Sequence, residues 1–171
     1  MAAAISKTSA ITTTTTTTTS SAMKLIVRRF YSDIWNKFDT TPSLVDELIS
    51  PTVAFRGTLE HGTTDREGFK RYVREIEASF PDFYQRVEQL WVDSENETCI
   101  ARMHWSATHS KDFRGYAATG RRFEYPGVGI FRIVNGKIQD VWAVGDTWGM
   151  FKVISGVEDK QKGTEVVDGK S

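Results

Sequence analysis

The first half of the chain spaces its apolar residues with the period of a helix. Over residues 24–38, large apolar side chains recur every three or four positions, which predicts an amphipathic helix with one broad apolar face. A second, shorter helix is predicted to begin at Pro42 and to stop before Pro51, because the residue before a proline disfavours helical geometry. The run Thr64-Asp65-Arg66-Glu67 has the pattern of a capping box and predicts a third helix, which Pro81 ends.

After Pro81 the apolar period changes to two, the period of a strand. Four strands are predicted: Tyr84–Val92, Thr98–His109, Arg122–Val134 and Lys137–Asp146. Hairpin turns are predicted at Glu95-Asn96 and at Asn135-Gly136, the second because both of its residues tolerate positive φ. A short strand is also expected over Thr52–Arg56, where β-prone residues precede a glycine.

Helices followed by a meander of strands predict an α+β fold with the helices on one face of the sheet. Strands of this length must twist, and Pro126-Gly127 and Gly129 are expected to be bulge points that curl the sheet. The prediction is a curved, antiparallel-rich sheet wrapped around the N-terminal helices, an α+β barrel that encloses a cone-shaped cavity.

The two ends of the sequence differ in composition from the part between them. Residues 1–22 hold an eight-threonine run and few large apolar side chains, so we expect them to be disordered, without the apolar block of a secretory signal. A polar, glycine-containing tail over 155–171 is expected to be disordered as well. The folded domain is therefore predicted to span 23–154.

Composition excludes several classes of partner. The chain has 22 basic and 22 acidic residues, so its charge balance gives no reason to expect a nucleic acid or an anionic membrane as partner. No apolar run approaches the roughly 18 residues that a membrane span needs. The single cysteine, Cys99, rules out an internal disulfide framework and predicts a cytoplasmic protein, with Cys99 itself a small core residue rather than a nucleophile.

Asp146 is the most informative ionisable residue, because it ends an otherwise apolar strand. Strand parity puts it on one face with Trp142 and Val144. If these two side chains point into the cavity, Asp146 is poorly solvated there and becomes a stronger base, able to take a proton from carbon between two carbonyl groups. The alternative is a surface aspartate that caps a short helix starting at Thr147, and the residues alone do not decide between the two.

The histidines offer one further catalytic candidate. His109 shares a face with Trp105 and is expected to donate a hydrogen bond to a developing enolate, or else to bond the backbone at the strand end. His104 has the opposite parity and is expected to be structural or exposed. His61 lies in the loop before the third predicted helix, and this loop either closes over the cavity or leaves His61 in solvent. The three do not have the spacing of a metal site, so no metal is expected.

Five aromatic residues are expected to lie partly in the cavity wall and partly in the ordinary core, and the sequence does not separate the two groups. They are Trp35, Trp91, Trp105, Phe131 and Trp142. Tyr31 lies on the apolar face of the first predicted helix, where its hydroxyl needs a partner if it is buried. The candidate substrate-binding residues are Tyr31, Trp35, His61, Trp105, Phe131 and Trp142.

The order of several short motifs resembles that of the SnoaL-like polyketide cyclases, a family within the ketosteroid-isomerase-like, or nuclear-transport-factor-2-like, superfamily. The motifs are Phe30-Tyr31…Trp35-Asn36, Phe80-Pro81-Asp82, Arg102…Thr108-His109, Gly115…Thr119-Gly120-Arg121, Phe131-Arg132…Asn135-Gly136-Lys137-Ile138 and Trp142…Asp146. The resemblance covers about 24–152. It differs from the family pattern at Ala107, at 110–112 and at 148–151, positions expected near the cavity mouth.

The resemblance implies a chemistry and a catalytic pair. Such enzymes close a polyketide ring by intramolecular aldol condensation without metal or organic cofactor, and their acid/base aspartate matches Asp146. Their Thr-His pair matches Thr108-His109, and their helix-one tyrosine matches Tyr31. The leading hypothesis is therefore a cofactor-independent cyclase or isomerase, a lyase or isomerase acting by enolisation on a small polyketide-like intermediate of secondary metabolism, with Asp146 and His109 as the catalytic residues.

Two other functions remained open. One is a non-catalytic small-ligand-binding or dimerisation module of the same fold. The other is an Asp-dependent hydrolase, in which Asp146 would activate a water molecule. For the leading hypothesis and for the binding module alike, a homodimer or higher homo-oligomer formed through the sheet face is expected.

Overall fold

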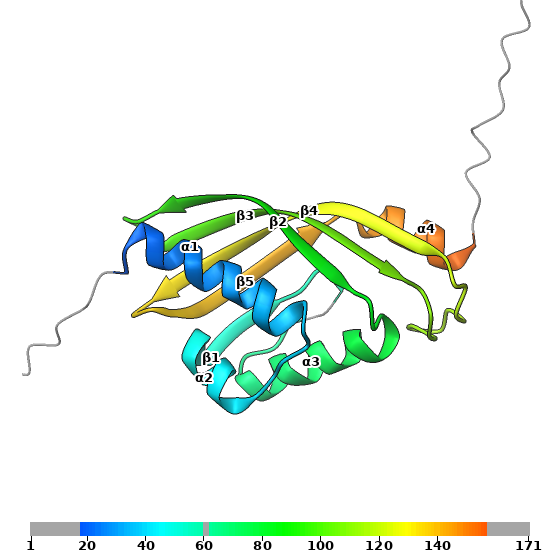
Figure 1. Ribbon diagram of the computed structural model, residues 1–171, viewed down its shortest axis with the longest axis horizontal. Coiled ribbons are helices and arrows are strands. Elements are labelled where there is room, and N and C mark those ends of the chain that lie inside the picture. The colour runs from blue at the N-terminus through cyan, green and yellow to red at the C-terminus, as the bar shows by residue number, and fades with distance from the viewer. Residues whose placement is uncertain (1–17, 60–61, 157–171) are drawn as a thin grey trace, which may run out of the picture.

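The computed structural model describes residues 18–59 and 62–156 (Figure 1). Its helices are α1 (Ser20–Arg29), the π-helix η1 (Phe30–Trp35), α2 (Pro42–Leu48), α3 (Arg66–Ser79) and α4 (Thr147–Ser155). Its strands are β1 (Ile49–Arg56), β2 (Tyr84–Asp93), β3 (Thr98–Thr108), β4 (Arg122–Val134) and β5 (Lys137–Gly145). The predicted α+β fold class is confirmed, and each predicted helix and strand overlaps an observed one, although some of their ends differ.

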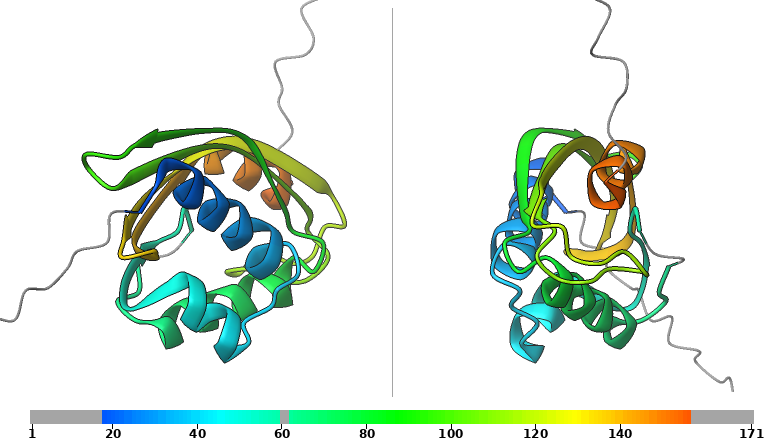
Figure 2. Two further views of the ribbon diagram at one scale, coloured as in Figure 1. Left: turned by 60° about the vertical axis from the view of Figure 1, so that its left-hand side comes forward. Right: turned by 90° about the vertical axis from the view of Figure 1, so that its right-hand side faces the viewer.

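The five strands form one sheet in the order β1-β5-β4-β3-β2. The pairs β2–β3, β3–β4 and β4–β5 are antiparallel, whereas β1 runs parallel to β5. The sheet curls over α1, α2 and α3, and α4 packs against β4 (Figure 2). Because β1 and β2 are its two edges, the sheet is open, and the predicted barrel is a curved open sheet closed by helices.

The first helix begins earlier than the sequence pattern predicted. Thr19 caps α1 by accepting a hydrogen bond at Oγ1 from the Ala22 amide, 3.3 Å away, so the helix starts at Ser20, a few residues before the domain boundary predicted at residue 23. The predicted boundary rested on the poor apolar content of residues 1–22, which says nothing about a capping threonine. The segments 1–17 and 157–171, on which most of the predicted disorder falls, lie outside the described residues.

α1 passes into η1 without a break, and the wider turn of η1 is held by i→i+5 bonds. The Asn36 amide donates to the Tyr31 carbonyl at 2.8 Å, and the Asp39 amide donates to the Ile34 carbonyl at 3.0 Å. Four of the six side chains of η1 are buried: Phe30, Tyr31, Ile34 and Trp35. Single π-helical turns are often found at functional sites, and this one turns three aromatic side chains toward the same cavity.

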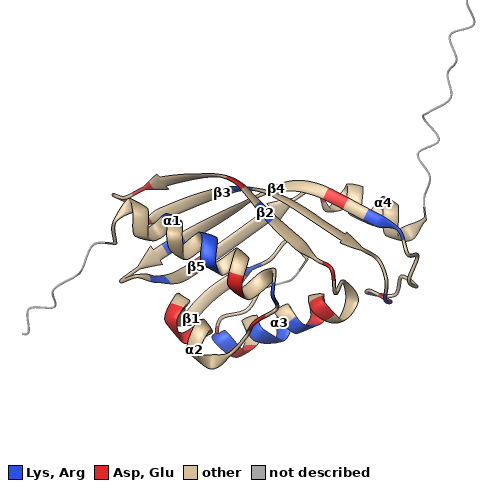
Figure 3. Cartoon of the chain, viewed as in Figure 1, with Lys and Arg blue, Asp and Glu red and all other residues tan. Residues whose placement is uncertain are grey.

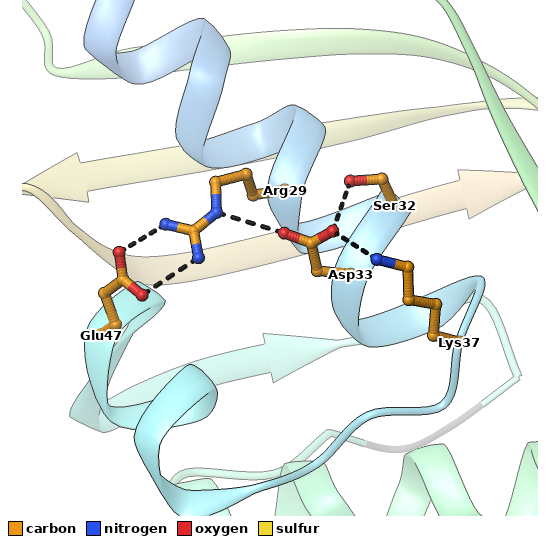
Figure 4. Close-up of polar contacts among 5 residues, drawn as sticks. All are labelled: Arg29, Ser32, Asp33, Lys37 and Glu47. Atoms are coloured by element: carbon orange, nitrogen blue, oxygen red, sulfur yellow. Dashed lines mark hydrogen bonds and ion pairs between the residues drawn. The ribbon is translucent and has the colours of Figure 1, made fainter.

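A charged network joins η1 to α2 on the outside of the molecule (Figure 4). The Arg29 guanidinium donates to both carboxylate oxygens of Glu47 and, at 3.2 Å, to Asp33. Asp33 also accepts from Lys37 and Ser32, each at 3.1 Å. These contacts link the last residue of α1 and the outer face of η1 to α2.

Gly127 and Gly129 in β4 have a different structural role from the predicted one. Gly127 and Gly129 pair with β3 in unbroken register, so the expected bulges at these positions are wrong. A Cβ at 127 would lie 1.9 Å from the Trp105 ring, and one at 129 would lie 2.5 Å from the Tyr31 hydroxyl. The glycines therefore make room for aromatic rings. The register shifts lie elsewhere, at Val87/Gln89 and at Arg132/Ile133.

Aromatic rings fill the space between the sheet and the helices. Phe30 packs edge-on against Phe131, with ring centroids 5.3 Å apart, and stacks on Phe69 at 5.7 Å. Cys99 is fully buried, and this burial raises the pKa of its thiol to about 11, as a core residue requires. None of the described helices is long and apolar enough to cross a membrane.

Charged residues of both signs lie on the helix surfaces that point away from the sheet (Figure 3). Along α3, the Lys70 ammonium pairs with Glu67 at 2.8 Å, one turn away. Such a mixed surface agrees with the balanced composition and gives no extended patch of one sign on these helices.

Candidate active site

A cavity lies between the helices and the inner face of the sheet. Its wall is almost entirely aromatic and aliphatic, and the lining residues are Phe30, Tyr31, Trp35, Phe55, Gly57, Thr58, Leu59, Tyr72, Ile76, Phe83, Gln85, Trp105, Tyr125, Val141 and Ala143. The space not filled by atoms is about 440 Å³ when the open mouth is counted, and about 40 Å³ of it admits the centre of a water molecule. The cavity thus holds a few waters and suits a flat, apolar ligand.

Two groups of elements build this wall from opposite sides. η1 contributes Phe30, Tyr31 and Trp35, all of which are buried. The strands contribute Gln85, Trp105 and Tyr125, which are aligned across β2, β3 and β4 by the strand register. The Trp105 and Tyr125 rings lie 5.2 Å apart.

The polar groups of the cavity are neutral hydrogen-bonding groups. The hydroxyls of Tyr31 and Tyr125 make no hydrogen bond with any described residue, and burial raises the pKa of each phenol far above its ordinary value. Both therefore stay protonated and can donate to a ligand. Among the described residues that line the cavity there is no carboxylate and no imidazole.

Three of the six predicted substrate-binding residues line this cavity: Tyr31, Trp35 and Trp105. Phe131 does not line it, although it is fully buried and its ring packs 5.7 Å from that of Tyr31. Trp142 lies on the other face of the sheet with half of its surface exposed. His61 lies outside the described residues.

Asp146 lies at the surface and caps the helix that starts at Thr147, as the second interpretation of the sequence predicts. Its carboxylate is exposed, and Oδ1 accepts a hydrogen bond from the Gly149 amide at 3.0 Å, which caps α4. The predicted inward direction of Trp142 and Val144 is wrong, because each is 50% exposed whereas Val141 is 1% exposed. The poorly solvated carboxylate inferred from that direction is therefore absent from the described cavity wall.

Asp146 nevertheless lies next to the cavity wall. Its neighbour Gly145 is so close to two lining rings that a Cβ there would stand 2.6 Å from Trp105 and 2.9 Å from Tyr125. The second carboxylate oxygen, Oδ2, accepts no hydrogen bond from a described residue. Asp146 is thus a solvated carboxylate at the edge of the site rather than a buried one inside it.

His109 is fully buried but does not line the cavity. Its Nδ1 lies 3.1 Å from Thr119 Oγ1, its ring packs 5.9 Å from that of Phe80, and its Nε2 has no partner among the described residues. Its backbone carbonyl accepts from the amides of Thr119 and Gly120, and its amide donates to Arg121. These contacts fasten the 110–121 loop, and the structure does not bring His109 together with Asp146 in the cavity.

His104 faces outward, as its parity predicted, and its Nε2 lies 3.2 Å from Glu124. In the part of the chain that the structure describes, no three His, Cys, Asp or Glu side chains gather as metal ligands would.

Sequence reasoning missed Gln85 and Tyr125, the two polar residues that the strands add to the cavity. Gln85 is 5% exposed, its carbonyl oxygen Oε1 accepts from the Trp105 indole at 2.8 Å, and its backbone is held by the Asn36 side chain. The available signal was parity, because Gln85 alternates with Tyr84 and Arg86, both of which are exposed.

A family model and a curated relative identify the family of this chain. Residues 25–154 match the model of the SnoaL-like polyketide cyclases. Nogalonic acid methyl ester cyclase from Streptomyces nogalater is 33% identical over 97 residues, which cover 56% of this chain and 72% of that protein.

Two solved structures illustrate the structural similarity. IdmH, a candidate polyketide cyclase from Streptomyces antibioticus, is 27% identical and superposes with a TM-score of 0.64, covering 75% of this chain and 95% of that one. A candidate SnoaL-like polyketide cyclase from Jannaschia sp. CCS1 shares the fold, with a TM-score of 0.72 at 16% identity over 81% of this chain and 94% of that one. The family match covers residues 25–154, well over half of the chain, and the chain belongs to the SnoaL-like polyketide cyclase family.

Proposed function

We propose that this protein closes a ring in a polyketide-like intermediate by enolisation, with the substrate bound in the aromatic cavity. The observation that carries the proposal is the cavity wall, where flat rings surround neutral hydrogen-bond donors in a space that holds few waters. In such a site a donor aimed at a developing enolate oxygen stabilises it more than in water, by a few kcal/mol. Membership of a cyclase family supports the same reaction class.

In this proposal Asp146 supplies the acid/base at the cavity edge. Its free Oδ2 takes a proton from a carbon activated by carbonyl groups, and the electron pair of that C–H bond forms the enolate. The enolate carbon attacks a second carbonyl carbon of the same molecule, and the new alkoxide takes the proton back from the carboxylic acid. The Tyr31 and Tyr125 hydroxyls donate to the enolate oxygen. The product of this addition has the mass of the substrate.

A second candidate function is a non-catalytic module that binds aromatic ligands. The observation that favours it is the lack of any carboxylate or imidazole among the described lining residues. In that case Asp146 is only the cap of α4, and the cavity binds its ligand without turning it over.

For either function we propose that a second copy of this chain covers the outer face of the sheet. Cross-strand pairing aligns a row of apolar side chains there: Trp91, Ile100, Ile130 and Trp142. Trp91 is 45% exposed and Trp142 50%. Charges of both signs flank this row, among them Arg102 with Glu88 at 3.1 Å and Arg56 with Asp140 at 2.8 Å. A surface with both signs can complement itself across a two-fold axis.

The cyclase proposal is tested with nogalonic acid methyl ester as the probe, incubated with the purified full-length chain and followed by liquid chromatography and mass spectrometry. An enzyme of this type gives a new isomer of unchanged mass, or one lighter by a water if dehydration follows. A product heavier by one water indicates hydrolysis instead. Binding of the ester without turnover supports the non-catalytic module.

Asp146→Asn and Asp146→Ser separate the two roles of this residue, since both side chains cap helices and neither acts as a carboxylate base. The proposal expects both variants to fold and to lose at least 100-fold in turnover, on the scale of acid–base catalysis. Near wild-type turnover in either variant would remove Asp146 from the mechanism.

A further inference from the structure

Gln85 is a polar residue held in the wall of an otherwise aromatic cavity, and its backbone is fixed from one side. The Gln85 amide donates to Asn36 Oδ1 at 2.8 Å, and Asn36 Nδ2 donates to the Gln85 carbonyl at 3.0 Å. Asn36 directly follows η1, so this pair ties the π-helical turn to β2. The Gln85 side chain therefore leaves the sheet at a defined place opposite Tyr31 and Trp35.

The side-chain amide of Gln85 can have only one orientation. The Trp105 indole Nε1–H points at it from the neighbouring strand at 2.8 Å, and an indole nitrogen can donate but not accept. The group facing Trp105 must therefore be the oxygen Oε1. This leaves the two N–H donors of Nε2 on the other side of the amide.

These donors have no partner within the described part of the chain. Every hydrogen bond of Gln85 to a described residue involves its backbone or Oε1. Among the described residues, the fully enclosed side-chain atoms without a partner are Thr63 Oγ1 and His109 Nε2, and Gln85 Nε2 is not one of them. It is therefore reached from the cavity, where a ligand acceptor can satisfy it.

We propose that the Gln85 side-chain N–H₂ binds the carbonyl oxygen of an aromatic ketone seated in the cavity. The proposal rests on the proposed function, because it takes this cavity as the substrate site. It adds that the ligand must carry a hydrogen-bond acceptor and that this acceptor points toward Gln85 on β2. The rings of Trp35, Trp105 and Tyr125 provide the apolar surface for the flat part of the ligand. An uncharged amide suits a neutral ketone oxygen, and it strengthens its bond as the oxygen gains charge on enolisation.

The test compares two ligands that differ by one oxygen. α-Tetralone is a bicyclic aromatic ketone, and tetralin is the same ring system without the carbonyl group. Dissociation constants are measured by ligand-observed NMR titration with the full-length protein. The wild type is expected to bind α-tetralone about fivefold more tightly than tetralin, as one net hydrogen bond implies.

Gln85→Met is expected to abolish this preference. Because Met also removes the acceptor of the Trp105 indole, tetralin is expected to bind more weakly as well, and its remaining binding shows that the variant is folded. The matched control is Gln89→Met, the same change at an exposed position of the same strand, and it should keep the preference. In the wild type itself, the Gln85 side-chain amide protons should move downfield with α-tetralone and not with tetralin. Equal binding of both ligands by the wild type, or a preference that survives Gln85→Met, would overturn the proposal.

This outcome is separable from that of the cyclase proposal. If the ketone preference depends on Gln85 and nogalonic acid methyl ester is not cyclised, the role of Gln85 stands and the proposed reaction fails. If the ester is cyclised and the ketone preference is absent, the reaction stands and the role of Gln85 fails.

Discussion

The ring of Trp105 occupies the space in which a side chain at Gly127 would begin. A Cβ at 127 would stand 1.9 Å from Cζ3 of the indole and 2.5 Å from the backbone oxygen of Val144. Since one neighbour is backbone, the site cannot relax by a rotamer change alone. The absence of a side chain at 127 is thus what lets Trp105 form the cavity wall.

Gly127→Ala should therefore destabilise the protein by about 2 kcal/mol, the usual cost of overpacking a filled interior. It should also displace Trp105, which a change in tryptophan fluorescence would report. The measurement is urea unfolding, with Val128→Ala at the exposed neighbouring position as the control and an expected effect within about 0.5 kcal/mol. Equal stability of Gly127→Ala and wild type would mean that the indole is not fixed in this position.

Asp146 stabilises the start of α4 whatever else it does. Replacement by alanine removes the acceptor for the Gly149 amide and should lower the free energy of unfolding by about 1 kcal/mol, whereas Asp146→Ser should retain most of that stability. Urea unfolding of both variants measures this directly. If alanine and serine are equally destabilising, the bond from the Gly149 amide contributes nothing to the stability of α4.

The position of each helix and strand was predictable because local pattern fixes it. Apolar periodicity and turn residues predicted β4 with its observed bounds. Pro42 begins α2, and Pro81 follows the end of α3, as expected. The direction of a strand's faces is not local. Alternation says that Trp142 and Val141 point oppositely, but only packing against the helices decides that Val141 is inside.

The same limit explains what was missed in the site. A glutamine at an alternating position resembles a solvent-facing residue, and the partners that make Gln85 stable inside come from η1 and β3. Gly127 and Gly129 have the composition of bulge points, yet rings from other elements account for them. Residues defined by partners distant in sequence are the ones that sequence pattern does not reveal.

Asp82 should make the fold sensitive to acid. Burial alone would raise the pKa of its carboxyl group, but hydrogen bonds from the Thr108 amide at 2.8 Å and hydroxyl at 2.7 Å, with the charge of Arg122, hold that pKa below its ordinary value of 3.8. A carboxyl group with a lowered pKa in the folded state stabilises the protein above its unfolded pKa. That contribution is lost as the pH falls below about 3.8 toward the folded-state value.

Asp82→Asn should cost less than about 1 kcal/mol at pH 7, because the Asp82 side chain is 45% exposed and solvent screens its charge. The same substitution should flatten the decline of stability between pH 4 and pH 2. Urea unfolding across this range measures both effects. The control is Glu77→Gln, an exposed carboxyl group on α3, which should leave the acid decline steep. A decline as steep in Asp82→Asn as in the wild type would show that other groups set the acid response.

The apolar row on the outer face predicts how self-association responds to mutation. Trp142 is at one end of the row and is 50% exposed, so in a two-fold dimer its ring would be buried against the partner copy. Burying a large side chain is worth about 1.5–3 kcal/mol relative to leaving it exposed, and a symmetric interface contains it twice. Trp142→Ser should therefore weaken association at least 100-fold while the monomer stays folded, since the residue adds little to the core. Sedimentation equilibrium at several concentrations measures the change.

Trp148→Ser is the matched control, because Trp148 is 72% exposed but lies on α4, away from the row. A wild-type chain that remains monomeric at all concentrations, or equal weakening by the two substitutions, would place the contact elsewhere or remove it.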